Sequence, residues 1–151
     1  MRLPTFLLAL ALFFTTSCAL GVKPSKTYSA PLLVEFPKVQ LAENERVVAF
    51  EMTVTCADIA ELRNIPTDWD IEIASYSWQY VIKGSCGHGS SAPTTISALD
   101  DVVVIRDAKD TDAKAGSCLS VKAMVATTID FEHSKEHHFT MKELKLKRAG
   151  T

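Results

Sequence analysis

From residue 46 onward, hydrophobic and polar side chains alternate along much of the chain. In 46–56 one face of the pattern consists of Val48, Phe50, Met52, Val54 and Cys56. Because successive side chains of a β-strand point to opposite faces of a sheet, this period of two predicts a half-buried strand. The same alternation predicts further strands in 69–73, 76–83 and 119–131.

Three other segments complete the predicted pattern. The unbroken apolar run 102–105 predicts a strand buried on both faces. In 139–146 the inward parity changes between Met141 and Leu144, which predicts a β-bulge at 142–143. Residues 57–64 fit either a short helix or a strand, because the segment is short and apolar on one side.

These segments together predict a mainly β fold. Several short strands, separated by polar turns and accompanied by at most one short helix, are typical of an antiparallel β-sandwich. The pattern is similar to immunoglobulin-like and cohesin-like sandwiches in architecture. Such a likeness does not carry function, because one architecture supports many unrelated activities.

The first 21 residues predict an export signal. A lone Arg2 precedes nine uncharged apolar residues at 6–14, and small polar residues follow. A helix of this length rises about 14 Å, which is less than half of a bilayer core. The segment is therefore a signal peptide rather than a membrane span, and we expect the protein in the periplasm, at the outer membrane or outside the cell.

The end of the signal leaves two alternatives open. Small residues at 15–17 precede Cys18 and resemble the lipobox of bacterial lipoproteins, although Thr15 stands where that family usually has Leu, Val or Ile. The resemblance implies a lipid anchor on Cys18. The small residues Ala19 and Gly21 equally suit ordinary signal cleavage before Val22. In either case we expect 22–37, which contains three prolines, to be a linker or edge segment, and 38–149 to be a single domain.

The net charge and the cysteine content limit the functions and the covalent bonds that we expect. Lys and Arg number 16 against 18 Asp and Glu, so the net charge of −2 gives no reason to expect nucleic-acid binding. An oxidising compartment favours a disulfide. Cys86 and Cys118 both lie in Gly/Ser-rich strand boundaries, whereas Cys56 continues an apolar face, so we predict the pair Cys86–Cys118.

Tyr76, Trp78 and Tyr80 occupy alternate positions and form an aromatic stripe. Because Ile82 continues the stripe while Ser77 and Gln79 lie between, we expect Trp78 to belong to the core. The alternative interpretation is that Tyr76, Trp78 and Tyr80 are exposed ligand contacts, which would form a stacking platform for sugar rings.

Residues 133–137 spell the H-x-x-E-H pattern of zinc proteases, with His133 and His137 as its histidines. That chemistry needs both histidines on one face of a helix. Here the segment joins two alternating runs and has no apolar helical face, so we predict a solvated hairpin turn with no metal and no catalytic residue.

The sequence thus predicts an exported, non-enzymatic β-sandwich that acts as a binding or structural module of the bacterial envelope. We expect its partner to be a protein or a glycan, with no cofactor, and membrane contact only through lipid on Cys18. The alternatives are a carbohydrate-binding module that uses Tyr76, Trp78 and Tyr80, and a small metal-dependent hydrolase that uses His133 and His137.

Overall fold

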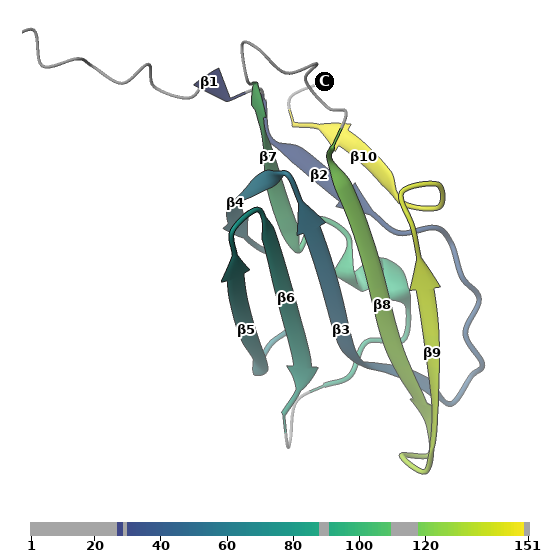
Figure 1. Ribbon diagram of the computed structural model, residues 1–151. Helices are drawn as coiled ribbons and strands as arrows, with labels where there is room; N and C mark the ends of the chain where they lie inside the picture. Colours follow the sequence, from purple (N-terminus) through teal and green to yellow (C-terminus); the bar gives the residue numbers. More distant parts are fainter. Residues whose placement is uncertain (1–26, 29, 88–90, 110–117, 150–151) are drawn as a thin grey trace, which may run out of the picture.

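The chain is built almost entirely from β-strands in the computed structural model, which describes residues 27–28, 30–87, 91–109 and 118–149 (Figure 1). In chain order its elements are β1 (Thr27–Tyr28), β2 (Leu32–Glu35), β3 (Glu45–Thr55), β4 (Ala57–Leu62), β5 (Trp69–Tyr76), β6 (Gln79–Cys86), the 3₁₀ helix η1 (Ile96–Leu99), β7 (Val103–Lys109), β8 (Ser120–Ile129), β9 (His133–Phe139) and β10 (Lys145–Arg148). No helix in these ranges is long and apolar enough to cross a membrane.

The strands form two antiparallel sheets, which we call sheet I and sheet II. In sheet I, Ile105 of β7 pairs with Ile59 of β4 on one side and with Leu32 of β2 on the other. β10 flanks β2, and β1 pairs with the end of β7. Sheet II has the order β5-β6-β3-β8-β9, and Figure 1 shows these five strands side by side. The predicted antiparallel β-sandwich is confirmed.

One hydrophobic core fills the space between the sheets. Phe50 of β3 stacks on Trp69 of β5 with ring centroids 6.2 Å apart, and Phe36 meets Phe139 edge-on at 5.5 Å. Gly84 of β6 is required where the Phe50 ring crosses that strand, because a Cβ at this position would overlap the ring. The alternation in β3 and β8 is confirmed by the residues that are buried there, namely Phe50, Met52, Val54, Val121, Ala123, Val125 and Thr127.

Residues 32–35 are an integral part of sheet I, although the sequence placed them in a linker or edge segment. β2 pairs with both β7 and β10, and the side chains of Leu32 and Val34 are buried. Pro31 and Pro37 lie outside the strand, so their missing amides remove no hydrogen bond from it. Residues 1–26, which include the predicted signal and Cys18, lie outside the described residues.

The bulge predicted at 142–143 is wrong, because the parity change there marks a passage between sheets. β9 ends in sheet II at Phe139, a turn follows in which the amide of Leu144 donates to the carbonyl of Thr140, and β10 then pairs in sheet I. A register shift does occur in β3, between Val47 and Ala49. Val47 is buried before the shift and Phe50 is the next buried residue after it, so the inward position expected for Val48 is wrong.

Cys56 forms the corner at which the chain leaves sheet II for sheet I. It lies between β3 and β4 with a φ of 61°, and its amide donates to the carbonyl of Trp78 over 2.8 Å. A disulfide joins it to Cys118, just before β8, with the two Cα atoms 5.7 Å apart. We call this group, Cys56, Cys118 and the carbonyl of Trp78, the disulfide corner.

The predicted pair Cys86–Cys118 is therefore wrong. β3 stops at Thr55, and Cys56, with its positive φ, lies outside the strand, so the alternation does not extend to its side chain. Cys86 ends β6, seven residues from Gln79, which lies opposite Thr55 beside the corner. Seven strand residues span about 23 Å, which is far beyond the reach of a disulfide to Cys118.

Replacing Cys118 by Ser should lower the free energy of unfolding by about 2 to 4 kcal/mol, because the bond closes a loop with a sequence separation of 62 residues. Cys86→Ser, the matched control, should change it by less than about 1 kcal/mol. Thermal and denaturant unfolding measure both variants, and peptide mapping without reduction identifies the bond. A peptide that links Cys86 to Cys118 would contradict the assignment.

Candidate functional site

The histidine cluster lies on a strand rather than in a turn or a helix. In the β8–β9 ladder His133 pairs with Ile129 and His137 with Val125, whereas residues 130–132 form the hairpin turn. The turn predicted at the histidines is therefore wrong by a few residues. His133 is exposed, and the His137 side chain is only 11% exposed. Within the described ranges, no three His, Cys, Asp or Glu residues are grouped so that they could hold a metal ion.

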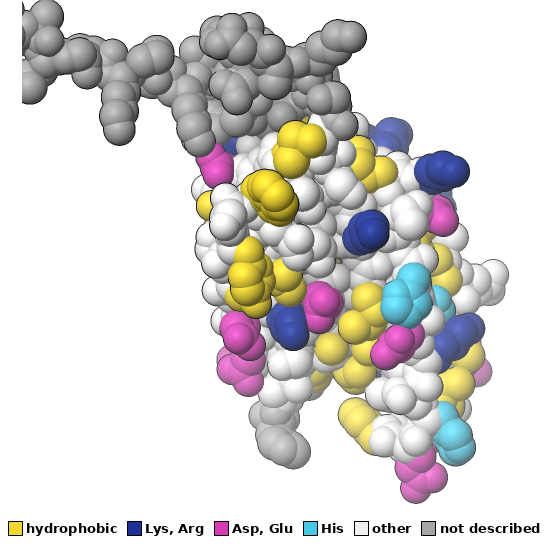
Figure 2. Space-filling model, viewed as in Figure 1, with side chains coloured by type: hydrophobic (Ala, Val, Ile, Leu, Met, Phe, Trp, Pro, Cys, Tyr) yellow, Lys and Arg dark blue, Asp and Glu magenta, His cyan; other side chains and the backbone are white. Residues whose placement is uncertain are grey.

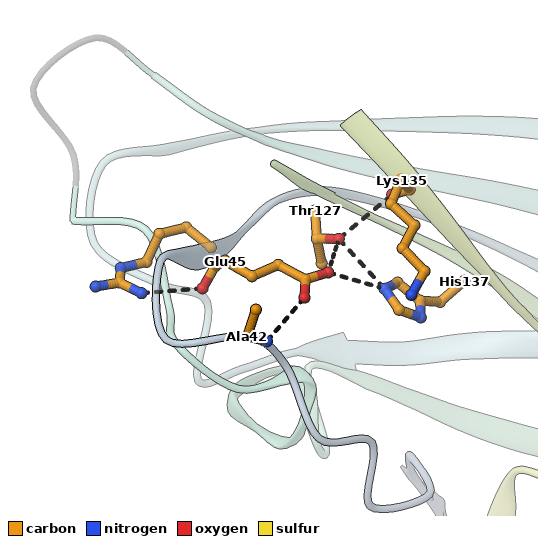
Figure 3. Close-up of polar contacts among 6 residues, drawn as sticks. Ala42, Glu45, Thr127, Lys135 and His137 are labelled. Carbon is orange, nitrogen blue, oxygen red and sulfur yellow. Dashed lines mark hydrogen bonds and ion pairs between the residues drawn. The ribbon is translucent and has the colours of Figure 1, made fainter. Parts of the chain in front are cut away.

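His137 belongs to a buried polar cluster with Glu45 and Thr127 (Figure 3). Glu45 is 5% exposed at the start of β3, and Thr127 of β8 is fully buried. The Thr127 hydroxyl lies 2.5 Å from Oε1 of Glu45, and Nε2 of His137 lies 3.2 Å from that hydroxyl and 3.4 Å from the same carboxylate oxygen. The other carboxylate oxygen accepts the amide of Ala42 over 3.0 Å.

These contacts suit structure rather than catalysis. The single hydroxyl proton of Thr127 is directed at Glu45, so the ring of His137 can donate to the hydroxyl oxygen but cannot remove its proton. A nucleophilic Thr–His pair needs the opposite direction of transfer, and its oxygen must be reachable by a substrate. Thr127 has no exposed surface. The cluster therefore ties the turn before β3 to β8 and β9.

The same hydrogen bonds determine the charge state of Glu45. Donation by Thr127, followed by donation from the amide of Ala42, lowers the pKa of Glu45 below its ordinary value of 4.5 and outweighs the effect of burial, which raises it. The ionised carboxylate is thus favoured in the folded protein. Its contribution to stability is fully present above the unfolded pKa and is lost as the pH falls through the folded one.

The aromatic stripe is divided by a tight turn. β5 ends at Tyr76 and β6 begins at Gln79, so Trp78 lies in the turn and is 71% exposed, and Tyr76 is 62% exposed. Tyr80 instead packs against the core, and its hydroxyl lies 3.5 Å from the carboxylate of Asp58. The expectation that Trp78 belongs to the core is wrong. The three residues do not share a surface, and only Tyr76 and Trp78 remain exposed.

A hollow of about 900 Å³ lies on the outer side of sheet II at the end remote from the disulfide corner. Its polar and aromatic lining includes Asn44, Arg46, Asp70, Thr128, Asp130 and Phe131. Arg46 and Thr128 pair across β3 and β8, while their chain neighbours Glu45 and Thr127 point inward to the buried cluster. The cluster therefore fixes the floor of this hollow from the inside.

Phe131 is the most unusual residue of the hollow. It lies at the tip of the β8–β9 hairpin with a φ of 59°, and 83% of its surface is exposed. A left-handed backbone is unfavourable for a bulky residue, and exposure of the ring to water adds a second cost. Asp130, with a φ of 54°, tolerates the same conformation better because Asp visits that region more readily.

This site is not visible in the sequence. The predicted strand over 119–131 runs through Phe131, because the alternation carries no sign that β8 ends at Ile129. Asp130 followed by an aromatic residue is also not one of the Asn-Gly or Asp-Gly pairs that announce a hairpin.

Known proteins provide no guide to this site. Comparisons of the chain with protein-family models, with curated proteins and with solved structures found no match.

Changing Glu45 to Gln should lower the free energy of unfolding by about 1 to 3 kcal/mol at pH 7, because the charge-assisted hydrogen bonds from Thr127 and Ala42 are weakened. The difference from the parent protein should shrink as the pH falls below 4.5, where the parent carboxylate becomes protonated. Denaturant unfolding between pH 3 and pH 7 measures this. The exposed Glu43→Gln variant is the control, and an equal pH-dependent loss in that variant would refute the assignment.

Proposed function

We propose that this chain is a non-enzymatic binding module exported to the bacterial cell envelope, and that its ligand site is the hollow beside Phe131. The observation that carries the proposal is the conformation of Phe131, which is both left-handed and exposed. Strained residues persist where a function requires their geometry. Contact with a ligand would cover the ring and explain why a glycine does not occupy this turn.

The chemistry of the hollow favours a carbohydrate ligand. Phe131 offers an apolar ring against which a sugar ring can stack, and Asn44, Arg46, Asp70 and Asp130 offer groups that hydrogen-bond hydroxyls. The Nη1 atom of Arg46 donates to the carbonyls of Glu43 and Glu45 over 2.7 and 3.0 Å, which holds its guanidinium in place beside the hollow. An apolar surface with a few positioned polar groups is typical of a small-ligand site.

The absence of catalysis is also part of the proposal. The one Thr–His–Glu arrangement among the described residues has its hydroxyl buried and its proton directed at the carboxylate, which disfavours a hydrolase that uses His137. His133 lies at the start of β9, four residues before His137, and its side chain is exposed. It therefore takes no part in the buried cluster of Glu45, Thr127 and His137. Export itself is supported by the apolar run at 6–14 and the small residues after it.

A second candidate is a carbohydrate site on Tyr76 and Trp78, and the exposure of both rings favours it. These residues lie at the β5–β6 turn, at the opposite end of sheet II from Phe131. Because Tyr80 faces the core, this surface would offer two rings instead of three. The two candidate sites can therefore be separated by single substitutions.

The test of the proposed site is Phe131→Gly. Glycine adopts a positive φ without penalty, so the free energy of unfolding should stay equal or rise by about 1 kcal/mol. Affinity for the sugar ligand should fall about tenfold with loss of the ring, which corresponds to about 1.4 kcal/mol. Isothermal titration with soluble peptidoglycan fragments and a panel of neutral oligosaccharides measures the affinity, and thermal unfolding measures the stability.

Trp78→Ala is the matched control, since it also removes one exposed ring. Loss of sugar binding in Trp78→Ala with full binding in Phe131→Gly would place the site at the β5–β6 turn. Full binding in both variants, or no binding of any sugar by the parent protein, would refute carbohydrate binding by either surface. Release of reducing sugar ends during the titration would refute the non-enzymatic assignment.

A further inference from the structure

We infer that the end of the sandwich around the disulfide corner is an interaction surface for anionic phospholipid, and that Trp78 enters the membrane interface there. The inference rests on the proposed export but not on the sugar site at Phe131, which lies at the opposite end. Four features support it, and each concerns the same end of the molecule.

The first feature is the direction from which the chain enters the fold. β1 begins at Thr27 and pairs with the end of β7, and Figure 1 shows β1 and β10 at this end of the molecule. Cys18 lies nine positions before Thr27 in the sequence, and an extended chain of that length spans about 30 Å. A lipid on Cys18 would therefore hold this end nearest to the membrane.

The second feature is the type of aromatic residue exposed there. Trp and Tyr prefer the boundary between water and lipid, because each ring has an apolar body and a polar group. Trp78 and Tyr76 are the exposed aromatic residues beside the disulfide corner, with 71% and 62% of their surfaces accessible. Phe131, which lacks a polar group, is at the far end.

The third feature is an unequal distribution of charge along the sandwich. Among the described side chains, the basic residues near the disulfide corner are Arg106, Lys122, Lys147 and Arg148, and the acidic residues there are Asp58 and Glu35, the latter paired with Lys147. The far end carries on its surface Arg46, Lys135 and Arg63, the last paired with Glu61, against Glu43, Asp68, Asp70, Asp130, Glu132 and Glu136.

Figure 2 shows the consequence on one face. Most of its Lys and Arg side chains lie in the upper half, toward the disulfide corner, and most of its Asp and Glu side chains lie in the lower half. An anionic surface attracts the first end and repels the second. The charge distribution therefore favours an orientation with the disulfide corner toward the membrane, as does the position of β1.

The fourth feature is the rigidity of the turn that carries Trp78. Its carbonyl accepts the amide of Cys56, and Cys56 is bonded to Cys118, so the backbone of this turn is held by two other strands. A ring presented from a fixed backbone loses little conformational freedom on binding. The turn can thus insert Trp78 without rearrangement of the sheets.

The experiment uses the exported form that begins at Val22, which retains every described strand, and vesicles of phosphatidylglycerol and phosphatidylcholine. The chain has two Trp residues, and Trp69 is buried, so emission that acrylamide quenches comes from Trp78. On anionic vesicles this emission should shift to the blue and become protected from acrylamide. Binding measured by sedimentation should weaken with added salt and on pure phosphatidylcholine.

Two variants and a matched control complete the test. Trp78→Ala should reduce the partition coefficient at least about fivefold, and Arg148→Glu should do the same, because each basic residue near an anionic surface contributes about this factor. Phe131→Ala, an equally exposed ring at the far end, should leave vesicle binding unchanged.

Three results would overturn the inference. They are the absence of vesicle binding, equal binding to neutral and anionic vesicles, and an equal loss in Phe131→Ala. Quenching or a shift of Trp78 emission by a polysaccharide, with no response to vesicles, would overturn it as well and would favour the second carbohydrate site. If the protein binds vesicles but no sugar, the proposed sugar site fails and the membrane inference stands. The two experiments therefore distinguish failure of the proposed function from failure of this inference.

Discussion

The corner at Cys56 is the constraint on which the two-sheet arrangement depends. A β-sandwich needs its chain to leave one sheet and enter the other without exposing unpaired backbone, and this chain does so in a single residue of positive φ between β3 and β4. The disulfide to Cys118 and the hydrogen bond to Trp78 hold that residue in place. The start of β8, the β5–β6 turn and the crossing are thereby fixed to one another.

The opposite end of sheet II is held by polar contacts instead of a covalent bond. Glu45, Thr127 and His137 form a cluster that is almost closed to water, and the strand periodicity places Arg46 and Thr128 directly outside it. A buried carboxylate is costly unless it is well hydrogen-bonded, and the contacts from Thr127 and Ala42 meet that need. The surface residues of the hollow are thus held in position by groups that are themselves buried.

Periodicity predicted the strands well and their ends poorly. The inward faces of β3 and β8 were visible in the sequence because side chains alternate in any strand, whatever its partner. The turn at Trp78, the hairpin tip at Phe131 and the crossing after Phe139 were not visible, because none carries a Gly or Pro marker. Each of these misplaced ends also changed a candidate site, because both exposed aromatic surfaces and the disulfide lie at strand termini. Pairing of Cys56 with Cys118 depends on which strand ends meet, and that information is long-range.

The position of the disulfide has a consequence for biogenesis. If the chain is exported from its N-terminus as proposed, Cys56 is the first cysteine of the domain to emerge, Cys86 is the next and Cys118 is the last. During that interval Cys86 is the available oxidation partner for Cys56 in the emerged domain, and a bond between them would have to be exchanged by thiolate attack before the native one forms. Alignment of β6 on β3 opposes the error, because that register carries Cys86 to the end of the sheet away from Cys56. On that proposal, the yield of native protein would depend on whether the β3–β6 ladder forms before the emerging chain is oxidised.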